Sequence, residues 1–466
     1  MPRNTDARSF TNYGWLVCIW VLIVSFQYGY HISVLNQLQA VLTCRIKDDT
    51  IPRHYGLPTC IPMSDATFSF VTSMFTVGGF FGSLFANLAV DQWGRKGATR
   101  FSATLNAVGA AVSGLAASVA PMVFGRFLVG LAAGIGICVG PIYLSEIAPS
   151  KIKGNVGVLT QLAIVIGILV TQGIGFGLAT PRQWRLVLLM SFALSAFQFF
   201  TSPMIAESPA YLNRNGLIDQ QKLVVRRLWG EEDDRQDPQD HSQEPLLVSK
   251  GNSGARPEEH QEPRLAVTIP QLLTSPELRR PLLTIVFAMT SQQLSGINAV
   301  LYYSNDILSK SLPNLAPHVS LGITIVNFFM TFPPIFFIER VGRKQLIKWS
   351  VTGALLSHLA VGFGLNSGLV TLSSIAITTF VMSFAIGLGP VPFVIIPEVA
   401  PFHAVSAISS VGLSLNWMVN FLVGLVFLQL RNFLANGDPM KEGRVFYVFA
   451  IVLFCSTTIF SRLYRG

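Results

Sequence analysis

The sequence predicts an all-α membrane protein with about twelve transmembrane helices in two pseudo-symmetric six-helix bundles. Hydrophobic residues make up 51% of the 466 residues, and charged residues make up only 12%, about half of what a soluble domain carries. Many nearly uncharged runs approach the roughly 20 residues that a bilayer crossing needs. Two short motifs from the first half of the chain recur in the second half, which indicates an internal duplication.

The apolar runs are separated by short polar connections and by one long hydrophilic segment. Val17 to Gln27, Leu162 to Ile174 and Leu186 to Phe200 are examples of such runs. The N-terminus is polar through Asn12 and the first run exceeds the length of a signal-peptide core, so we expect it to remain as the first span. An even number of spans places both termini on the same side of the membrane.

The excess of positive charge has a topological meaning. The formal net charge is +9, and basic residues concentrate in short connections on one side of the predicted spans, which is typical of cytoplasmic loops and not of nucleic-acid binding. The residues in these connections are Arg95, Lys96, Lys151, Lys153, Arg340, Arg343 and Lys344. Both termini are therefore expected to be cytoplasmic.

The hydrophilic segment divides the chain. Between Gly230 and Arg264 there are 10 acidic and 4 basic residues, a net charge of −6, with few apolar side chains, so the segment cannot bury enough surface to offset its ordering entropy. We interpret it as a flexible linker, with a regulatory or partner-binding segment as the alternative. The expected organisation is a cytoplasmic tail (1–13), a first bundle (14–206), a partly disordered cytoplasmic linker (207–277) and a second bundle (278–466).

The repeated motifs lie at nearly the same offset. "DQWGRK" at Asp91 to Lys96 recurs as "ERVGRK" at Glu339 to Lys344, 248 residues later. "SEIAP" at Ser145 to Pro149 recurs as "PEVAP" at Pro397 to Pro401, 252 residues later. Two motifs at one offset imply a duplicated six-helix unit, which places a substrate site between the halves near the bilayer midplane.

The charges in these motifs can form ion pairs at one face of the bundle. Arg95 can reach Glu146, and Arg343 can reach Glu398, which would hold that face closed. Positive-inside anchoring is the alternative, but it leaves the two repeated glutamates unexplained. The acidic residues that precede the arginines, Asp91 and Glu339, can lie near a helix N-terminus or a cation.

Seven motifs in colinear order resemble the sugar porter family of the major facilitator superfamily, the family of the facilitative glucose transporters. They are "GGFFGSLFANLAVDQWGRK", "GRFLVG", "PIYLSEIAPSKIKG", "TQLAIVIGILVTQ", "SQQLSGINAVLYYS", "ERVGRK" and "GPVPFVIIPE". The match runs from about Phe26 to Trp417. The resemblance implies the major facilitator fold, a central cavity for a monosaccharide and transport by alternating access, most simply as facilitated diffusion.

The resemblance also implies which residues bind and gate. The sugar-contacting positions are Gln161, Gln292, Gln293, Asn298, Asn327, Phe393, Asn416, Trp417 and Asn420. The gating positions are Tyr302 and Tyr303, the span-ten residues Gly387, Gly389, Pro390 and Pro392, and the charged residues Asp91, Arg95, Glu146, Lys153, Glu207, Glu339, Arg343 and Glu398.

The chain departs from the family pattern at several of these positions. Ala385 replaces a frequent glutamate and Phe393 a frequent tryptophan, so one hydrogen-bonding partner and one indole N–H are missing. Val405 replaces an arginine, so we expect weaker ion pairing in the second half. Ala210 replaces another arginine close to Glu207. A specialised substrate, altered gating or a loss of efficient transport would account for these changes.

The chemistry of the amides agrees with a sugar site. A sugar is uncharged and carries hydroxyls that donate and accept, as neutral amides do. Gln292, Gln293 and Asn298 would lie within two turns of one helix, and Trp417 offers an apolar plate for a sugar C–H face. The alternative is that these amides hydrogen-bond neighbouring helices, which is common in membranes.

A histidine in the first span occupies the position that the resemblance links to coupling. His31 stands where proton-coupled members carry aspartate and uniporters carry asparagine, near Arg126. Burial and a nearby cation both oppose protonation of an imidazole, so we expect His31 to be neutral at pH 7. A neutral helix contact and passive transport are the preferred interpretation, and pH-sensitive gating or proton coupling is the alternative.

The sequence also bears on functions other than transport and on the location of the protein. A sugar sensor that binds without transport is an alternative, because charges are missing at Val405 and Ala210. We expect no enzyme activity, cofactor or metal, since the sequence lacks a phosphate-binding loop, metal-ligand spacing and an activated nucleophile. Cys44 and Cys60 flank a polar loop that we expect to be non-cytoplasmic, where they can form a disulfide or remain as free thiols. We expect a monomer in the plasma membrane or the vacuolar membrane.

Overall fold

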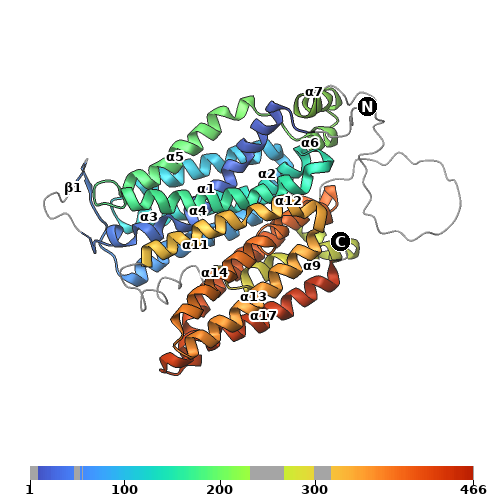
Figure 1. The fold of residues 1–466 in the computed structure, drawn as a ribbon. Helices are drawn as coiled ribbons and strands as arrows, with labels where there is room; N and C mark the ends of the chain where they lie inside the picture. Colours follow the sequence, from blue (N-terminus) through green and yellow to red (C-terminus); the bar gives the residue numbers. More distant parts are fainter. Residues whose placement is uncertain (1–8, 47–52, 55, 231–266, 299–315, 465–466) are drawn as a thin grey trace, which may run out of the picture.

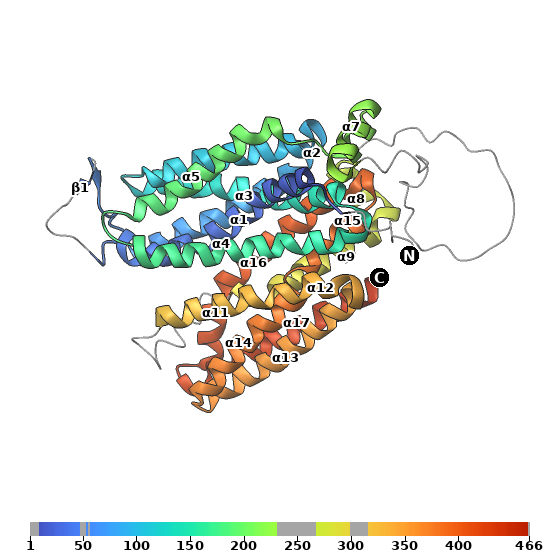
Figure 2. The ribbon, with the colours of Figure 1, turned by 45° about the horizontal axis from the view of Figure 1, so that its top comes forward.

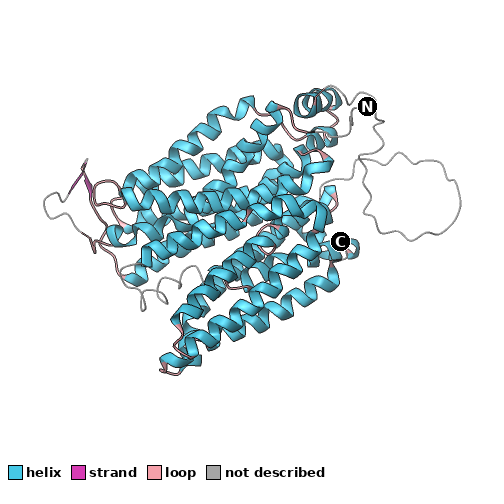
Figure 3. Cartoon of the chain, in the orientation of Figure 1, coloured by secondary structure: helices cyan, strands magenta, loops and turns pink. Residues whose placement is uncertain are grey.

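The structure is a computed structural model that describes residues 9–46, 53–54, 56–230, 267–298 and 316–464. Almost all of the described chain is helical (Figure 3). The predicted gating residues Tyr302 and Tyr303 lie outside the described residues, as does most of the acidic segment between Gly230 and Arg264.

The first half of the chain supplies six membrane-spanning helices. A long element, α2 (Asp65–Gly114), contains two of them, because Gly94 interrupts it with a φ of 73° in the motif "DQWGRK". A glycine takes this backbone conformation without steric strain. The other spans of this half are α1 (Asn12–Leu42), α3 (Val119–Ile147), α4 (Lys153–Leu178) and α5 (Trp184–Thr201).

Short elements join the spans. The strands β1 (Arg53–His54) and β2 (Leu57–Pro58) form an antiparallel pair after α1. Three short helices occupy the connection between the halves: α6 (Pro209–Arg214), α7 (Ile218–Trp229) and α8 (Ile269–Thr274).

The second half repeats the pattern with more breaks inside its spans. Gly342 has a φ of 88° between α12 and α13, which matches Gly94 in the first motif. The helices are α9 (Pro276–Leu294), α11 (Ala316–Met330), α12 (Phe332–Val341), α13 (Arg343–Asn366), α14 (Val370–Ile386), α15 (Val391–Val399), α16 (Val405–Ala435) and α17 (Arg444–Leu463). Because α11 with α12 and α14 with α15 each make one interrupted span, the halves together give the twelve-helix arrangement that the sequence predicts.

The two halves lie side by side with their helices running in the same general direction (Figures 1 and 2). The short helices α6, α7 and α8 and the C-terminus lie at one end of the molecule, which we call the linker end. The strands and the Cys44–Cys60 disulfide lie at the opposite end, which we call the disulfide end.

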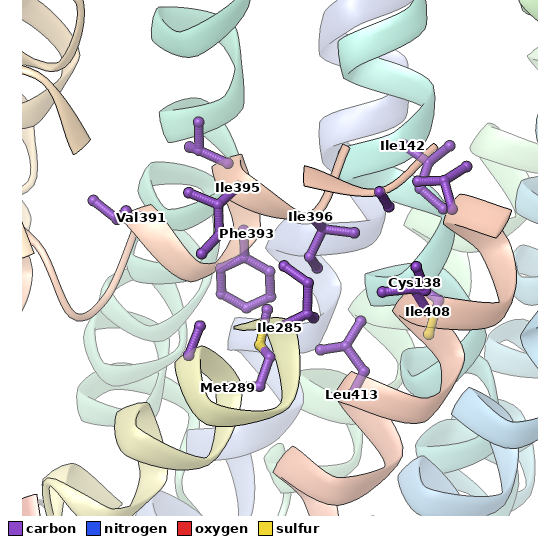
Figure 4. Packing of buried hydrophobic residues seen from close by; sticks show 14 of the residues in the cluster. Cys138, Ile142, Ile285, Met289, Val391, Phe393, Ile395, Ile396, Ile408 and Leu413 are labelled. Atoms are coloured by element: carbon purple, nitrogen blue, oxygen red, sulfur yellow. The ribbon is translucent and has the colours of Figure 1, made fainter. Parts of the chain in front are cut away.

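The halves contact each other through an apolar cluster near the linker end. Cys138 and Ile142 of α3 lie against Ile408 of α16, and Ile285 of α9 belongs to the same buried cluster (Figure 4). Hydrogen bonds between the halves accompany it: the Ser406 hydroxyl donates to the Asp91 carboxylate, and the Gly154 N–H donates to Glu339. The two bundles are therefore joined at the linker end.

Candidate functional site

The last turn of α9 carries two glutamines that begin a chain of hydrogen-bonded amides. Gln292 donates Nε2–H to the carbonyl oxygens of Leu388 and Gly389, at 3.0 and 2.9 Å. These carbonyls belong to the break between α14 and α15 in span ten, where Pro390 caps α15. An amide of span seven therefore satisfies backbone acceptors that a continuous helix would satisfy internally.

The chain of amides continues into α16. Asn416 donates to Gln292 Oε1 at 3.0 Å and to the Met289 carbonyl at 2.8 Å. Gln293 donates to Asn416 Oδ1 at 3.1 Å. Asn298 donates to Gln293 Oε1 at 2.8 Å and to Asn420 Oδ1 at 2.6 Å. These groups satisfy one another, and each can exchange its partner for a hydroxyl group of similar geometry.

The first half meets this chain at Gly389. Gln161 of α4 is 6% exposed, and a Cβ placed on Gly389 would lie 3.2 Å from Gln161 Nε2. Gln161 and Gln292 therefore approach the same glycine from opposite halves. A Cβ at position 389 would press against the Gln161 amide and the Phe384 ring, so glycine allows this close approach.

One detail of the predicted site is wrong. Gln292, Gln293 and Asn298 do not lie on one continuous helix, because α9 ends at Leu294 and Gly296 has a φ of 77°. Positive φ is outside the right-handed helical region. The break turns Asn298 back toward Gln293, so the two amides bond to each other instead of being spread along the helix.

Asn327 and Phe393 are both buried but lie outside the hydrogen-bonded chain. Asn327 in α11 is 7% exposed, and its Oδ1 has no partner in the part of the protein that the structure describes. Phe393 in α15 packs in the apolar cluster with Ile285 and Met289 of α9 (Figure 4). Asn327 thus offers an unused acceptor, and Phe393 offers an apolar ring beside Ile285 and Met289.

Trp417 makes contacts that were not predicted from the amino-acid sequence. It is 2% exposed and packs edge-on against Tyr28 and Phe75 of the first half, with ring centroids 5.4 Å apart in each pair. A Cβ on Gly79 would lie 2.5 Å from the indole ring. In this conformation the indole is an inter-half contact rather than an open plate. Tyr28, Phe75 and Gly79 were not predicted from the sequence. Two signals could have pointed to this contact: Tyr28 lies about one helical turn before His31, and Gly79 belongs to the motif "GGFFGSLFANLAVDQWGRK".

His31 is held by polar neighbours of its own half. Its Nε2 lies 2.7 Å from the Ser191 hydroxyl of α5. Arg126 donates to the backbone carbonyl of His31 at 3.3 Å, and its guanidinium lies 4.7 Å from the centroid of the Phe75 ring. The predicted neighbours are therefore close, and the arginine donates to the backbone carbonyl of His31.

Arg95 and Glu146 form a buried pair at the linker end of the first half. Arg95 Nη2 lies 2.7 Å from Glu146 Oε1, and the side chains are 1% and 8% exposed. The guanidinium also lies 5.3 Å from the ring centroid of Phe402 in the second half. The pair therefore sits where the two halves meet.

Two further carboxylates complete this cluster. Glu207 accepts backbone N–H groups of Arg95, Lys96 and Ser208. Burial raises the pKa of the Glu207 carboxyl, and these N–H groups offset part of that effect because they favour the charged form. Asp91 lies 3.4 Å from Arg214 and accepts the Ser406 hydroxyl of the second half.

The equivalent cluster of the second half is more exposed. Arg343 lies 2.7 Å from Glu398 and 2.8 Å from Glu339, and its side chain is 20% exposed. Glu339 accepts the N–H of Gly154, next to Lys153 at the start of α4. Val405 begins α16 and is 3% exposed, so the position lacking the arginine is filled by apolar packing.

The structure also shows where the predicted prolines of span ten and the two loop cysteines lie. Pro390 and Pro392 begin α15 and are buried at the break of span ten. Cys44 and Cys60 are joined by a disulfide. Among the described residues, no group of three or more His, Cys, Asp and Glu side chains is arranged to hold a metal ion.

Comparisons with known proteins show which family this chain belongs to. Residues 17–463 match the family described as sugar (and other) transporter. Vacuolar protein sorting-associated protein 73 of Saccharomyces cerevisiae is 30% identical, covering 99% of this chain and 94% of that protein. Facilitated glucose transporter member 3 of solute carrier family 2 from Ovis aries is 33% identical, covering 92% and 85%.

A solved structure shares the fold. The proton:xylose symporter XylE of the major facilitator superfamily, bound to 6-bromo-6-deoxy-D-glucose, superposes with a TM-score of 0.74 at 16% identity, covering 96% of this chain and 95% of that chain. This likeness shows the fold of two duplicated bundles. The chain is a multi-pass membrane protein that belongs to the sugar (and other) transporter family.

Proposed function

We propose that this protein carries a monosaccharide, a hexose or a related sugar or polyol, across a membrane by alternating access. The observation that carries the proposal is the buried chain of amides from Gln292 through Asn416 to Gln293. Gln161 of the other half approaches this chain at Gly389. These side chains are uncharged and can both donate and accept, which suits a ligand covered with hydroxyls.

The orientation of the carrier follows from its charge distribution. The linker end carries the repeated basic motifs, and the positive-inside tendency assigns that end, with both termini and the linker, to the cytoplasm. The inter-half bonds of Asp91 and Glu339 lie at the same end. The described conformation is then the one in which the cytoplasmic side is closed, with the ion pairs acting as the inner gate.

Passive transport is favoured over proton coupling. The Arg126 guanidinium contacts the His31 backbone, and the imidazole is tied to the neutral Ser191 hydroxyl. A carboxylate that could exchange a proton for an ion pair with this arginine is absent at position 31. Transport therefore equilibrates the sugar and does not concentrate it.

Uptake into proteoliposomes tests this function. Purified protein is reconstituted, and entry of labelled glucose, fructose, galactose, xylose and myo-inositol is followed with and without unlabelled sugar inside. We expect counterflow of at least one sugar and no accumulation when a proton gradient is imposed. Accumulation abolished by a protonophore would establish symport instead, and binding without exchange would establish a sensor. The protein would act in the plasma membrane or the vacuolar membrane, as a monomer.

A further inference from the structure

Span seven is interrupted just after the end of α9. Gly296, with a φ of 77°, interrupts the helix directly after Ser295. A carbonyl beside such a break can accept a hydrogen bond from another span, and a buried carbonyl needs a donor as its partner. Ser295 is fully buried, so water is not at hand to fill this role.

A histidine from another span supplies that donor. His358 of α13 is 1% exposed, and its Nε2 lies 2.9 Å from the Ser295 carbonyl oxygen. A carbonyl oxygen only accepts, so Nε2 carries the hydrogen. The Nδ1 atom has no hydrogen-bond partner within the described chain. Burying an imidazole whose Nδ1 atom has no such partner costs free energy, so an apolar side chain would serve better if packing were its only role. The hydrogen bond made by Nε2 explains why a histidine is present.

Aromatic rings fix the direction of this imidazole. The His358 ring centroid lies 4.5 Å from that of Phe380 and 6.4 Å from that of Phe449. Phe449 also covers the break itself, because a Cβ placed on Gly296 would lie 3.0 Å from its ring. Spans nine, ten and twelve therefore enclose the interrupted turn, and His358 makes the polar contact to it.

The same turn carries the amides of the proposed sugar site. The Ser295 hydroxyl donates to the Gln292 carbonyl at 2.6 Å. Ser295 is thus bonded to His358 through its carbonyl and to Gln292 through its hydroxyl. The side chains of Gln292 and Gln293 leave this turn toward Asn416.

We propose that His358 is a positioning residue: its Nε2–H holds the interrupted turn of span seven in the orientation that presents Gln292 and Gln293 to the sugar. The inference rests on the proposed function, because it assigns a role in sugar affinity. His358 itself acts through the Ser295 carbonyl and does not contact the substrate. Loss of the donor should raise the half-saturation concentration of transport while the maximal rate per folded protein changes less.

Two matched substitutions test this role. Glutamine and methionine are unbranched and of similar length, but only glutamine carries an N–H that can reach the position of Nε2. We expect His358→Met to raise the KM of sugar entry about fivefold, the equivalent of one hydrogen bond of about 1 kcal/mol, and His358→Gln to stay close to the parent protein. Ser357→Ala, at a neighbouring buried position outside the site, is the control for general disturbance of the helix.

Protein amount and thermal unfolding are measured for each variant, so that a folding defect is seen separately from a change in KM. If His358→Met does not fold, His358→Phe, which keeps an aromatic ring, replaces it as the variant without a donor. Equal KM values for the glutamine variant and the donorless variant would overturn the proposal. Absence of transport by the parent protein would instead overturn the proposed function.

Discussion

Arg343 Nη2 lies 2.7 Å from Glu398 Oε1, in a pair whose side chains are 20% and 23% exposed. The equivalent atoms of Arg95 and Glu146 are also 2.7 Å apart, but those side chains are only 1% and 8% exposed. The repeated motif therefore gives the same geometry in two environments. Because water screens exposed charges, the two pairs contribute unequally to the closed linker end.

Arg95→Gln is expected to destabilise the protein far more than Arg343→Gln. The first substitution leaves Glu146 buried without its cation, which costs roughly 3–5 kcal/mol, whereas the loss of a partly exposed pair costs about 1 kcal/mol or less. Thermal unfolding in detergent or nanodiscs measures the difference. Arg340→Gln, at an exposed residue of the same turn, is the control. An equal or larger effect at Arg343 would contradict the assigned burial.

Gln292→Leu is expected to reduce sugar transport by about tenfold or more, because it leaves the Leu388 and Gly389 carbonyls and Asn416 without their partner. Initial rates of counterflow over a range of sugar concentrations measure the loss. Thr290→Val on the same helix is the control, since the Thr290 hydroxyl donates to the Val286 carbonyl of its own helix. Unchanged rates in Gln292→Leu would remove this amide from the site.

Cys138 can report when the linker end opens. The thiol is 1% exposed, and its sulfur lies 3.9 Å from the carbonyl oxygens of Ser83 and of Ser409 across the seam. In a protein with Cys18 and Cys455 replaced by alanine, we expect slow reaction with a small maleimide and faster reaction when transported sugar is added. The disulfide leaves Cys44 and Cys60 unreactive. A rate that is independent of sugar would speak against separation of the halves at Cys138.

Glu207 should make stability depend on pH with a defined sign. Burial raises its pKa in the folded protein above the value in the unfolded chain, so the folded state binds this proton more tightly. The associated stability is present below the unfolded pKa and is lost as the pH rises through the folded pKa. We therefore expect Glu207→Gln to gain thermal stability relative to the parent protein between mildly acidic pH and pH 7. A relative loss over that range would show that the backbone N–H groups outweigh the desolvation.

Several features of this protein could be predicted from the residues alone. Apolar runs of spanning length need no tertiary context to be identified, since lipid excludes unpaired backbone groups and so imposes helices. The repeat of "DQWGRK" as "ERVGRK" likewise predicts two equivalent bundles. The repeated arginines and the repeated glutamates lie at the same end of the helices, which explains why the pairings Arg95 with Glu146 and Arg343 with Glu398 could be anticipated.

Other features were decided only by the tertiary structure, because an amide, a ring or an imidazole has many possible partners and packing selects among them. The sequence did not show that Trp417 packs on Tyr28 and Phe75, since this contact depends on how closely the two halves approach at Gly79. It did not show that Gly296 interrupts span seven. The composition and the repeat determined a duplicated membrane bundle, and the close packing of distant helices determined which polar groups meet inside it.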